Sequence, residues 1–143
     1  MNIVEAINYK DSVIAILETE KLPVSDLSPD LENFFVALHD RKITGVSGLE
    51  IYGNYGLLRS LVVLPGFRDQ GVAGNLVGQV ENLAISKSLK AIYLLTETAP
   101  EYFKRKGYTQ ITRTDVPPEV QQSSEFSYAC PQTAIVMMKT LTN

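Results

Sequence analysis

The residues best suited to chemistry lie in a short, glycine-punctuated segment between an apolar stretch and an amphipathic one. Residues 65–74 read Pro-Gly-Phe-Arg-Asp-Gln-Gly-Val-Ala-Gly, and helical periodicity begins at Val72. The first turn of a helix leaves about four backbone N–H groups without partners and carries the positive end of the helix dipole. Gly71, Ala73 and Gly74 are small enough for an anion to approach the backbone closely. The segment therefore predicts a binding site for a phosphate or pyrophosphate.

Two common phosphate-binding motifs share part of this pattern but lack essential residues. Gly66 and Gly71 have the spacing of a P-loop, yet Val72 and Ala73 stand where that motif has Lys and Ser or Thr. The glycines also give only part of the G-x-G-x-x-G fingerprint of dinucleotide-binding folds. A different class of phosphate-bearing ligand is therefore expected.

The surrounding sequence predicts strands and helices that would position this loop. Residues 57–64 are apolar at nearly every position, so we expect a strand that is buried on both faces. Val72, Leu76 and Val80 recur at helical spacing and indicate a long helix. Strands are expected at residues 1–8, 33–38, 43–52, 57–64, 91–95, 108–112 and 134–141, and helices at residues 11–20, 72–89 and 98–106.

Turn signals separate these elements. The polar run His39–Lys42 and the pair Gly53–Asn54 each predict a turn between two strands. Gly107 is expected to end the third helix. Residues 114–124 predict a loop, with a short helix after Pro117–Pro118. The element order is that of a mixed α/β fold, with a right-handed crossover expected where strands flank the long helix.

Composition limits the classes of function. With 143 residues the chain suits a single domain, 1–143, and its net charge of -3 gives no basic footprint for nucleic acid. No apolar stretch approaches the roughly 20 residues that a membrane span needs, and no signal peptide follows Met1. The lone Cys130 is expected to be a packed free thiol, which fits a cytoplasmic location. One His and one Cys make a metal site implausible, so no metal is predicted.

The pattern Arg68-x-x-Gly71-x-Ala73, after Leu-x-Val-x-Pro, resembles the pyrophosphate loop of the GNAT superfamily of N-acetyltransferases. The family signature is Arg/Gln-x-x-Gly-x-Gly/Ala, and its N–H groups hold the pyrophosphate of acetyl-CoA. The resemblance covers essentially the whole chain, most specifically residues 57–108. It implies the GNAT fold, a mixed and mostly antiparallel sheet of about six to seven strands, flanked by helices and splayed at two central parallel strands.

Carried over to this sequence, the resemblance implies that acetyl-CoA is the co-substrate. The backbone of residues 61–63 would serve the pantetheine arm and the thioester, and an N–H near Val63 would stabilise the oxyanion. The expected cofactor-binding residues are Leu61, Val62, Val63, Arg68, Asp69, Gln70, Gly71, Val72, Ala73, Gly74, Thr96 and Phe103.

The general acid is the point at which this sequence departs from the family. Residues 99–108 resemble the stretch Ala-x-x-Phe-Tyr-x-Lys-x-Gly-Phe, whose tyrosine protonates the departing thiolate. That position is Phe103 here, and Tyr102 lies one residue away, about 100° around a helix. Tyr102 is therefore the candidate acid, with solvent as the alternative proton donor.

The remaining candidates lie on two neighbouring strands. Glu50 is the first candidate for a base that takes the proton of an ammonium group, and a solvated strand carboxylate is the alternative. Arg59 and Ser60 are candidate substrate contacts. The guanidinium of Arg59 would pair with a carboxylate of the acceptor, and an ordinary salt bridge is the alternative.

Two further stretches bear on the acceptor. Residues 58–61 and 126–131 resemble a GNAT subgroup associated with arsenic resistance, and the Ala-Pro-Glu-x-Phe helix resembles the acetyltransferase domain of N-acetylglutamate synthases. Both imply a small-molecule amine acceptor, an amino acid or its analogue. The alternatives are a non-catalytic acetyl-CoA sensor, which Phe103 keeps open, and a protein N-acetyltransferase. A homodimer is compatible with the resemblance, because GNAT proteins commonly dimerise.

Overall fold

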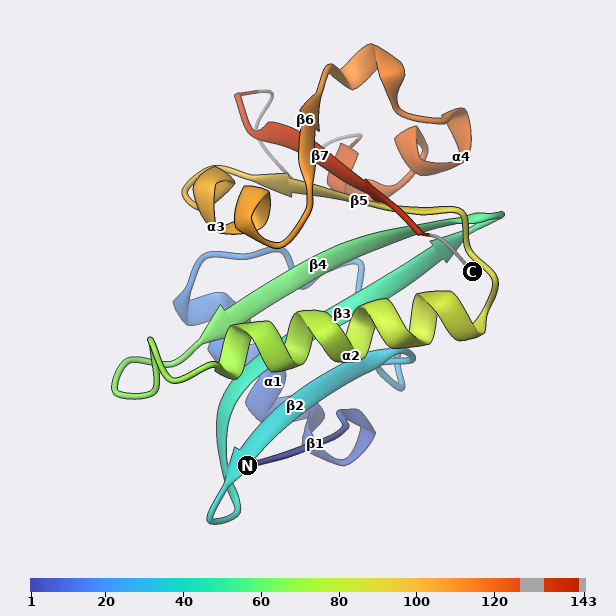
Figure 1. Ribbon diagram of the computed structural model, residues 1–143. Coiled ribbons are helices and arrows are strands. Elements are labelled where there is room, and N and C mark those ends of the chain that lie inside the picture. The colour runs from blue at the N-terminus through green and yellow to red at the C-terminus, as the bar shows by residue number, and fades with distance from the viewer. Residues whose placement is uncertain (127–132, 142–143) are drawn as a thin grey trace. The chain divides into compact units, whose positions relative to one another are not determined.

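The strands and helices follow one another along the chain much as the periodicity predicts (Figure 1). The computed structural model describes residues 1–126 and 133–141. In chain order the elements are β1 (Asn2–Glu5), α1 (Lys10–Thr19), β2 (Phe34–His39), β3 (Lys42–Tyr52), β4 (Tyr55–Val63), α2 (Val72–Ser86), β5 (Ala91–Thr96), α3 (Pro100–Arg105), β6 (Thr109–Ile111), α4 (Pro118–Gln121) and β7 (Ile135–Thr140), with 3₁₀ turns at Ile7–Tyr9 and Arg113–Asp115.

Every predicted strand and helix is present, and the differences lie at the ends. The first strand stops at Glu5, because a 3₁₀ turn at Ile7–Tyr9 leads directly into α1. The long helix stops at Ser86, three residues before its predicted end. The short helix expected after the two prolines is α4.

The seven strands form one mixed sheet in the order β1-β2-β3-β4-β5-β7-β6. The β1–β2, β2–β3, β5–β7 and β6–β7 ladders are antiparallel. The β4–β5 ladder is parallel and pairs Tyr55–Leu57 with Ala91–Tyr93, three residues of a nine-residue strand. The predicted mixed, mostly antiparallel sheet is confirmed.

The chain forms two compact units that are interleaved in sequence. The first unit consists of Met1–Leu49 and Arg59–Leu83, and the second consists of Glu50–Leu58 and Ala84–Asn143. Each unit has its own hydrophobic cluster. A single domain over the whole chain stays a prediction.

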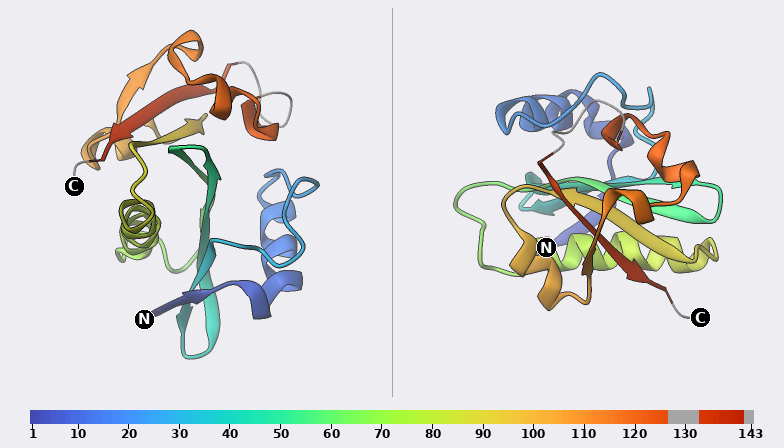
Figure 2. Two further views of the ribbon diagram at one scale, coloured as in Figure 1. Left: turned by 90° about the vertical axis from the view of Figure 1, so that its right-hand side faces the viewer. Right: turned by 90° about the horizontal axis from the view of Figure 1, so that it is seen from above.

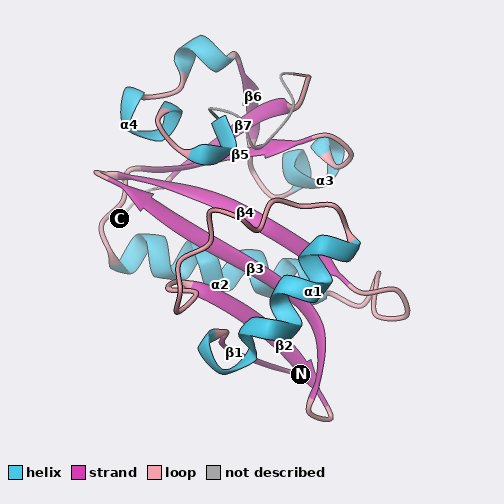
Figure 3. Ribbon diagram, turned by 180° about the vertical axis from the view of Figure 1, so that it is seen from behind, coloured by secondary structure: helices cyan, strands magenta, loops and turns pink. Residues whose placement is uncertain are grey.

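In the first unit, two helices cover opposite faces of the strands. α2 lies in front of β2 and β3 in Figure 1, and α1 lies in front of them when the molecule is seen from behind (Figure 3). Gly45 of β3 makes room for α2, and Gly48 of β3 makes room for the Phe34 ring of β2. A Cβ on Gly45 would lie 2.9 Å from Leu76 of α2, and a Cβ on Gly48 would lie 2.6 Å from the ring of Phe34.

The second unit packs α3 and α4 with the last three strands (Figures 1 and 2). β7 lies between β5 and β6 in the sheet. The hydrophobic cluster of the second unit contains strand residues such as Leu57 and Tyr93 together with Val120 of α4 and Phe126. Tyr55 and Tyr93 meet edge to face, with their ring centroids 5.9 Å apart.

Three helices end in the same way, in a left-handed residue. Lys21, Ser88 and Gly107 have φ values of 60°, 58° and 94°. After α2, the Leu89 N–H donates to the Ala84 carbonyl and the Ser88 N–H donates to the Ile85 carbonyl, the two bonds of a Schellman motif. The same pair of bonds closes α1 and α3. Gly107 ends α3 as predicted.

Both predicted strand turns are two-residue hairpins. Asp40 and Arg41 have φ values of 49° and 68°, the positive pair that a type I′ turn requires. Gly53 has φ of 62° at the first central position, as in a type II′ turn.

Among the described residues, no helix is both long and apolar enough to cross a bilayer.

Candidate functional site

The glycine-punctuated loop joins the end of β4 to the start of α2, where the sequence predicts an anion site. Three of its residues have left-handed φ values, 93° at Gly66, 63° at Asp69 and 84° at Gly71. Glycine adopts such angles without strain. This backbone path delivers the chain from a buried strand into the first turn of a 15-residue helix within eight residues, 64–71.

The start of α2 is open on the side where a ligand would lie. A Cβ built on Gly71 meets no heavy atom within 4 Å. The Asn75 N–H donates to the Gly71 carbonyl, the bond that begins the helix. The N–H groups of Val72, Ala73 and Gly74 precede it and belong to the turn that has no intrahelical acceptors. Space, donors and the helix dipole therefore fit a phosphate group here.

Side chains of the loop hold the loop itself in shape. The Arg68 Nε donates to the Val63 carbonyl at 2.9 Å, and the Gln70 Nε2 donates to the Gly66 carbonyl at 3.1 Å. Arg68 also lies 3.6 Å from a carboxylate oxygen of Glu20. These contacts give the loop a defined conformation without a ligand, which lowers the entropic cost of binding one.

Arg59 of β4 is enclosed and engages a carboxylate of this chain. Its side chain is 0% exposed, and its Nη1 and Nη2 donate to the two oxygens of Asp26 at 2.5 and 3.0 Å. The sequence offers two interpretations of Arg59, contact with a carboxylate of the acceptor and an ordinary salt bridge, and within the chain the guanidinium pairs with Asp26. Contact between Arg59 and an acceptor carboxylate stays a prediction.

Ser60, the other predicted substrate contact, has a strained backbone. Its φ is 62°, although it lies inside strand β4. The Nε of Arg59 donates to its hydroxyl at 3.2 Å. Such backbone outliers cluster at functional sites and persist only where neighbouring contacts enforce them.

Glu50 and Thr96 of the second unit have partners close by in sequence. The Tyr52 hydroxyl donates to Glu50 Oε1 at 2.8 Å, and Glu50 is half-buried. The two side chains share a strand face because they lie two residues apart. Thr96 Oγ1 accepts the N–H of Ala99, just before α3, at 3.1 Å. The carboxylate is thus oriented by a phenol, and Thr96 fixes the start of α3.

Tyr102 and Phe103 occupy different environments on α3. Phe103 is 4% exposed and packs edge to face against Tyr108, with 5.6 Å between ring centroids. Tyr102 is less buried, and Lys106 Nζ and Arg105 Cζ lie 5.6 and 6.0 Å from its ring centroid. Phe103 is therefore a core residue of the second unit, whereas two cations lie against the ring of Tyr102.

The predicted site residues fall into two groups, one in each unit. Arg59 to Gly74 belong to the first unit, whereas Glu50, Thr96, Tyr102 and Phe103 belong to the second. Cys130 lies outside the described residues. The described part of the chain contains no group of three or more His, Cys, Asp or Glu side chains that could hold a metal ion.

Sequence reasoning missed two partners of these residues. Tyr52 could have been found, because it lies two positions from Glu50 on a predicted strand. Asp26 could not, because it lies 33 residues from Arg59 and outside every predicted strand and helix.

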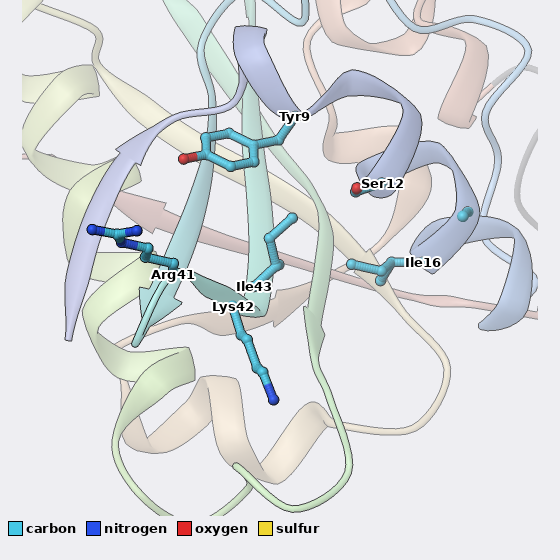
Figure 4. Close-up of a pocket in the computed structure, with 7 residues that line it drawn as sticks. Tyr9, Ser12, Ile16, Arg41, Lys42 and Ile43 are labelled. Carbon is cyan, nitrogen blue, oxygen red and sulfur yellow. The ribbon is translucent and has the colours of Figure 1, made fainter.

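A hollow of about 490 Å³ lies elsewhere in the first unit (Figure 4). Tyr9, Ser12 and Ile16 line it from the α1 side, and Arg41 and Ile43 line it from the β2–β3 turn. None of the predicted site residues lines this hollow.

The family model described as "Acetyltransferase (GNAT) domain" matches residues 30–110, more than half of the chain. An uncharacterised N-acetyltransferase of Chlorobaculum tepidum is 28% identical over 125 residues, which cover 85% of this chain and 79% of that protein.

Other relatives are named for amino-acid acetylation. An amino-acid acetyltransferase of Ralstonia nicotianae is 29% identical over 117 residues, 80% of this chain. One of Mycobacterium tuberculosis is 30% identical over 95 residues, 63% of this chain. The matches span only 25% and 53% of these two relatives.

Solved structures show the same fold. A Mycobacterium tuberculosis protein in complex with coenzyme A and a compound designated NLQ superposes with a TM-score of 0.81 at 23% identity, over 99% of this chain and 100% of that one. N-acetylglutamate synthase of Neisseria gonorrhoeae, complexed with coenzyme A and N-acetyl-glutamate, gives 0.80 at 17% identity, over 99% of this chain and 35% of that one.

Proposed function

Because this chain belongs to the GNAT acetyltransferase family, we propose that it transfers the acetyl group of acetyl-CoA to the amine of a free amino acid or a close analogue. The observation that carries the proposal is the open start of α2, where Gly71 has φ of 84° and free space on its Cβ side. The amino-acid acceptor rests on the relatives named as amino-acid acetyltransferases.

The first unit is proposed to hold the cofactor. The N–H groups of residues 72–74 would receive the pyrophosphate, and the backbone of Leu61–Val63 would serve the thioester end. Acetyl-CoA, when bound, supplies an activated acetyl group. The Arg68 bond to the Val63 carbonyl links these two parts of the cofactor site, because it ties the loop to the last residue of β4.

Two side chains are proposed to handle protons. Most amino groups are protonated at neutral pH, so an acceptor must lose a proton before it can attack a carbonyl carbon. Glu50, oriented by the Tyr52 hydroxyl, is the proposed base. Tyr102 is the proposed acid, because Phe103 has no exchangeable proton and lies in the core.

The decisive experiment measures free thiol released from acetyl-CoA with a panel of acceptors. The panel contains L-glutamate and other amino acids, simple amines, and peptides with a free N-terminus or lysine. We expect kcat/KM for at least one amino acid to exceed that for every peptide by tenfold or more. Tight acetyl-CoA binding without turnover would instead favour a sensor, and preference for a peptide would favour a protein acetyltransferase.

Two variants of α2 test the cofactor site. Gly71→Glu places a carboxylate where the pyrophosphate is proposed to lie and should abolish acetyl-CoA binding in calorimetry. Gly78→Glu is the matched control, because it adds the same charge to the same helix at another glycine with free space on its Cβ side. Equal affinities of the two variants would reject the loop as the pyrophosphate site.

Glu50→Gln tests the proposed base. It should lower kcat and move the pH optimum.

A further inference from the structure

Strand β4 contains a conformation that its own sequence does not favour. Ser60 has φ of 62° and lies five residues inside the strand, which begins at Tyr55. A left-handed residue costs free energy when it carries a Cβ, so neighbouring contacts must hold it there. Leu61–Val63 follow immediately, and the directions of their N–H groups depend on the angle at Ser60.

The contacts that could hold Ser60 come from the preceding residue. The Arg59 guanidinium donates from Nε to the Ser60 hydroxyl at 3.2 Å, from Nη2 to the Pro23 carbonyl at 3.1 Å, and from both Nη atoms to Asp26. The side chains of Arg59 and Asp26 are 0% and 11% exposed. The Ser47 hydroxyl also donates to the Arg59 carbonyl at 3.4 Å.

Through these contacts the guanidinium bridges at least three groups of the chain, which are the Ser60 hydroxyl, the Pro23 carbonyl and the Asp26 carboxylate. It joins the strained strand residue to two residues of the α1–β2 connection (residues 20–33). Bidentate pairing with Asp26 fixes the plane of the guanidinium, and that plane fixes the direction of Nε toward Ser60. Removing the carboxylate from a buried ion pair is strongly destabilising, so we expect the orientation of the guanidinium to depend on Asp26.

We propose that Arg59 is a positioning residue, which the Asp26 carboxylate locks so that Ser60 keeps its left-handed backbone and presents the N–H groups of Leu61–Val63. The inference rests on the proposed function, which assigns those N–H groups to the thioester end of acetyl-CoA. In this proposal Arg59 acts through Ser60 rather than on the substrate, because its guanidinium is enclosed by groups of this chain. The competing interpretation is that Asp26 only occupies a place that the acceptor's carboxylate takes over.

The test compares Asp26→Asn with the wild-type chain. Asparagine keeps the shape of the side chain but loses the charge and one acceptor oxygen. The orientation of the guanidinium plane is then no longer fixed. We expect kcat with acetyl-CoA and L-glutamate, or a faster panel amino acid, to fall at least tenfold. The Kd for coenzyme A and the KM for the acceptor should stay within about twofold, since the pyrophosphate loop is untouched.

A rescue separates positioning from general destabilisation. Glycine adopts a left-handed φ without help, so adding Ser60→Gly to Asp26→Asn should raise kcat at least threefold above that of the single variant. Asp40→Asn is the matched control, because it makes the same substitution in an exposed pair with His39, 3.5 Å apart, in the same unit. If Asp26→Asn does not fold, Asp26→Glu keeps the charge and should show an intermediate loss of kcat.

A second readout works without turnover. Amide hydrogen exchange by NMR should quicken at least tenfold at residues 61–63 in Asp26→Asn and stay unchanged at Met137 of β7. Unchanged exchange, wild-type kcat, or failure of the rescue would each overturn the proposal. A lower acceptor KM with unchanged kcat would overturn it in favour of displacement of Asp26. If the wild-type chain acetylates nothing, the proposed function fails and the exchange experiment still decides the role of Arg59.

Discussion

Asp69 is an acidic residue within a loop that is proposed to hold an anion. It is exposed, has φ of 63°, and lies between Arg68 and Gln70. Two like charges 4 Å apart repel by about 1 kcal/mol in water and more where solvent is displaced. Asp69 should therefore weaken the affinity that the neighbouring N–H groups provide.

Asp69→Asn should tighten acetyl-CoA binding by roughly two- to tenfold, and the gain should shrink as salt screens the charge. Asparagine also tolerates a left-handed φ, so the backbone is kept. Asp40→Asn provides the control, because Asp40 is likewise exposed with φ of 49°. Calorimetry at low and at high salt measures the effect. A loss of affinity in Asp69→Asn would contradict the proposal that the loop holds the anion beside Asp69.

Tyr102→Phe tests the proton donor. General acids contribute about 10²- to 10⁴-fold to rate, so kcat should fall at least tenfold if Tyr102 protonates the thiolate. Tyr108→Phe is the comparison, because it removes a phenol from the same group of packed rings. Stopped-flow thiol release measures both variants. Equal rates for Tyr102→Phe and the wild type would assign the proton to solvent.

At this scale the sequence reveals what is local. The anion loop is readable because its glycines and the helix that follows are contiguous. The Arg59–Asp26 pair is hidden, because nothing near Asp26 marks it as the partner of a residue 33 positions away. The strain at Ser60 is hidden as well, since a serine in an apolar strand gives no sign of a positive φ.

Helix ends form the next scale, where three Schellman motifs use three different residues. Only Gly107 has no Cβ, whereas Lys21 and Ser88 adopt left-handed angles with one. A left-handed residue that carries a Cβ costs about 1–2 kcal/mol, which a glycine at the same position avoids. Part of this advantage is lost, because glycine has a larger conformational entropy in the unfolded chain. Two of the three motifs are therefore not at their stability optimum.

Ser88→Gly and Lys21→Gly should each raise the free energy of unfolding by about 0.5–1 kcal/mol, or the thermal midpoint by about 1–4 °C. Gly107→Ala should do the reverse, because alanine disfavours φ of 94° and its Cβ would lie 3.3 Å from Lys139 Cε. Differential scanning calorimetry measures all three. A destabilised Ser88→Gly would mean that the serine side chain contributes more than its backbone strain costs.

Element types were predictable because periodicity is a property of neighbouring residues. The sequence predicts that α2 ends at Leu89, three residues beyond its observed end at Ser86. The left-handed position of its Schellman motif is held by Ser88, and a serine there gives no signal of a helix end. The end of α3 was predicted correctly for the corresponding reason, since Gly107 is the residue that signals such an end.

At the scale of the whole molecule, one buried phenol couples stability to pH. Burial raises the pKa of Tyr93 above its usual value of 10.0, and the neighbouring Tyr55 adds to the increase. The folded chain therefore keeps a proton that the unfolded chain releases first. This part of the stability is present below pH 10 and is lost as pH rises toward the folded-state pKa.

Tyr93→Phe removes this dependence. Its free energy of unfolding should fall less than that of the wild type between pH 8 and about pH 11. Urea titrations at the two pH values give the difference, and Tyr9→Phe in the first unit serves as the control. Equal slopes for the wild type and Tyr93→Phe would show that this phenol ionises as readily in the folded chain as in the unfolded one.

The family and the mixed sheet could be predicted from one chain because the loop signature and the element order agree. The division into two units could not, because it depends on which distant segments meet. Residues 50–58 show no break in pattern, although they belong with residues 84–143 rather than with their neighbours in sequence.

That interleaving decides how the polypeptide can be split. No single break in the backbone separates the two units, since residues 50–58 interrupt the first of them. A break between α2 and β5 would leave the N-terminal piece with Tyr55–Leu57, the very strand segment that pairs with Ala91–Tyr93 of the other piece. Each fragment would thus carry an edge that the other completes, which makes this connection the natural place for a split reporter that regains activity when its halves reassociate.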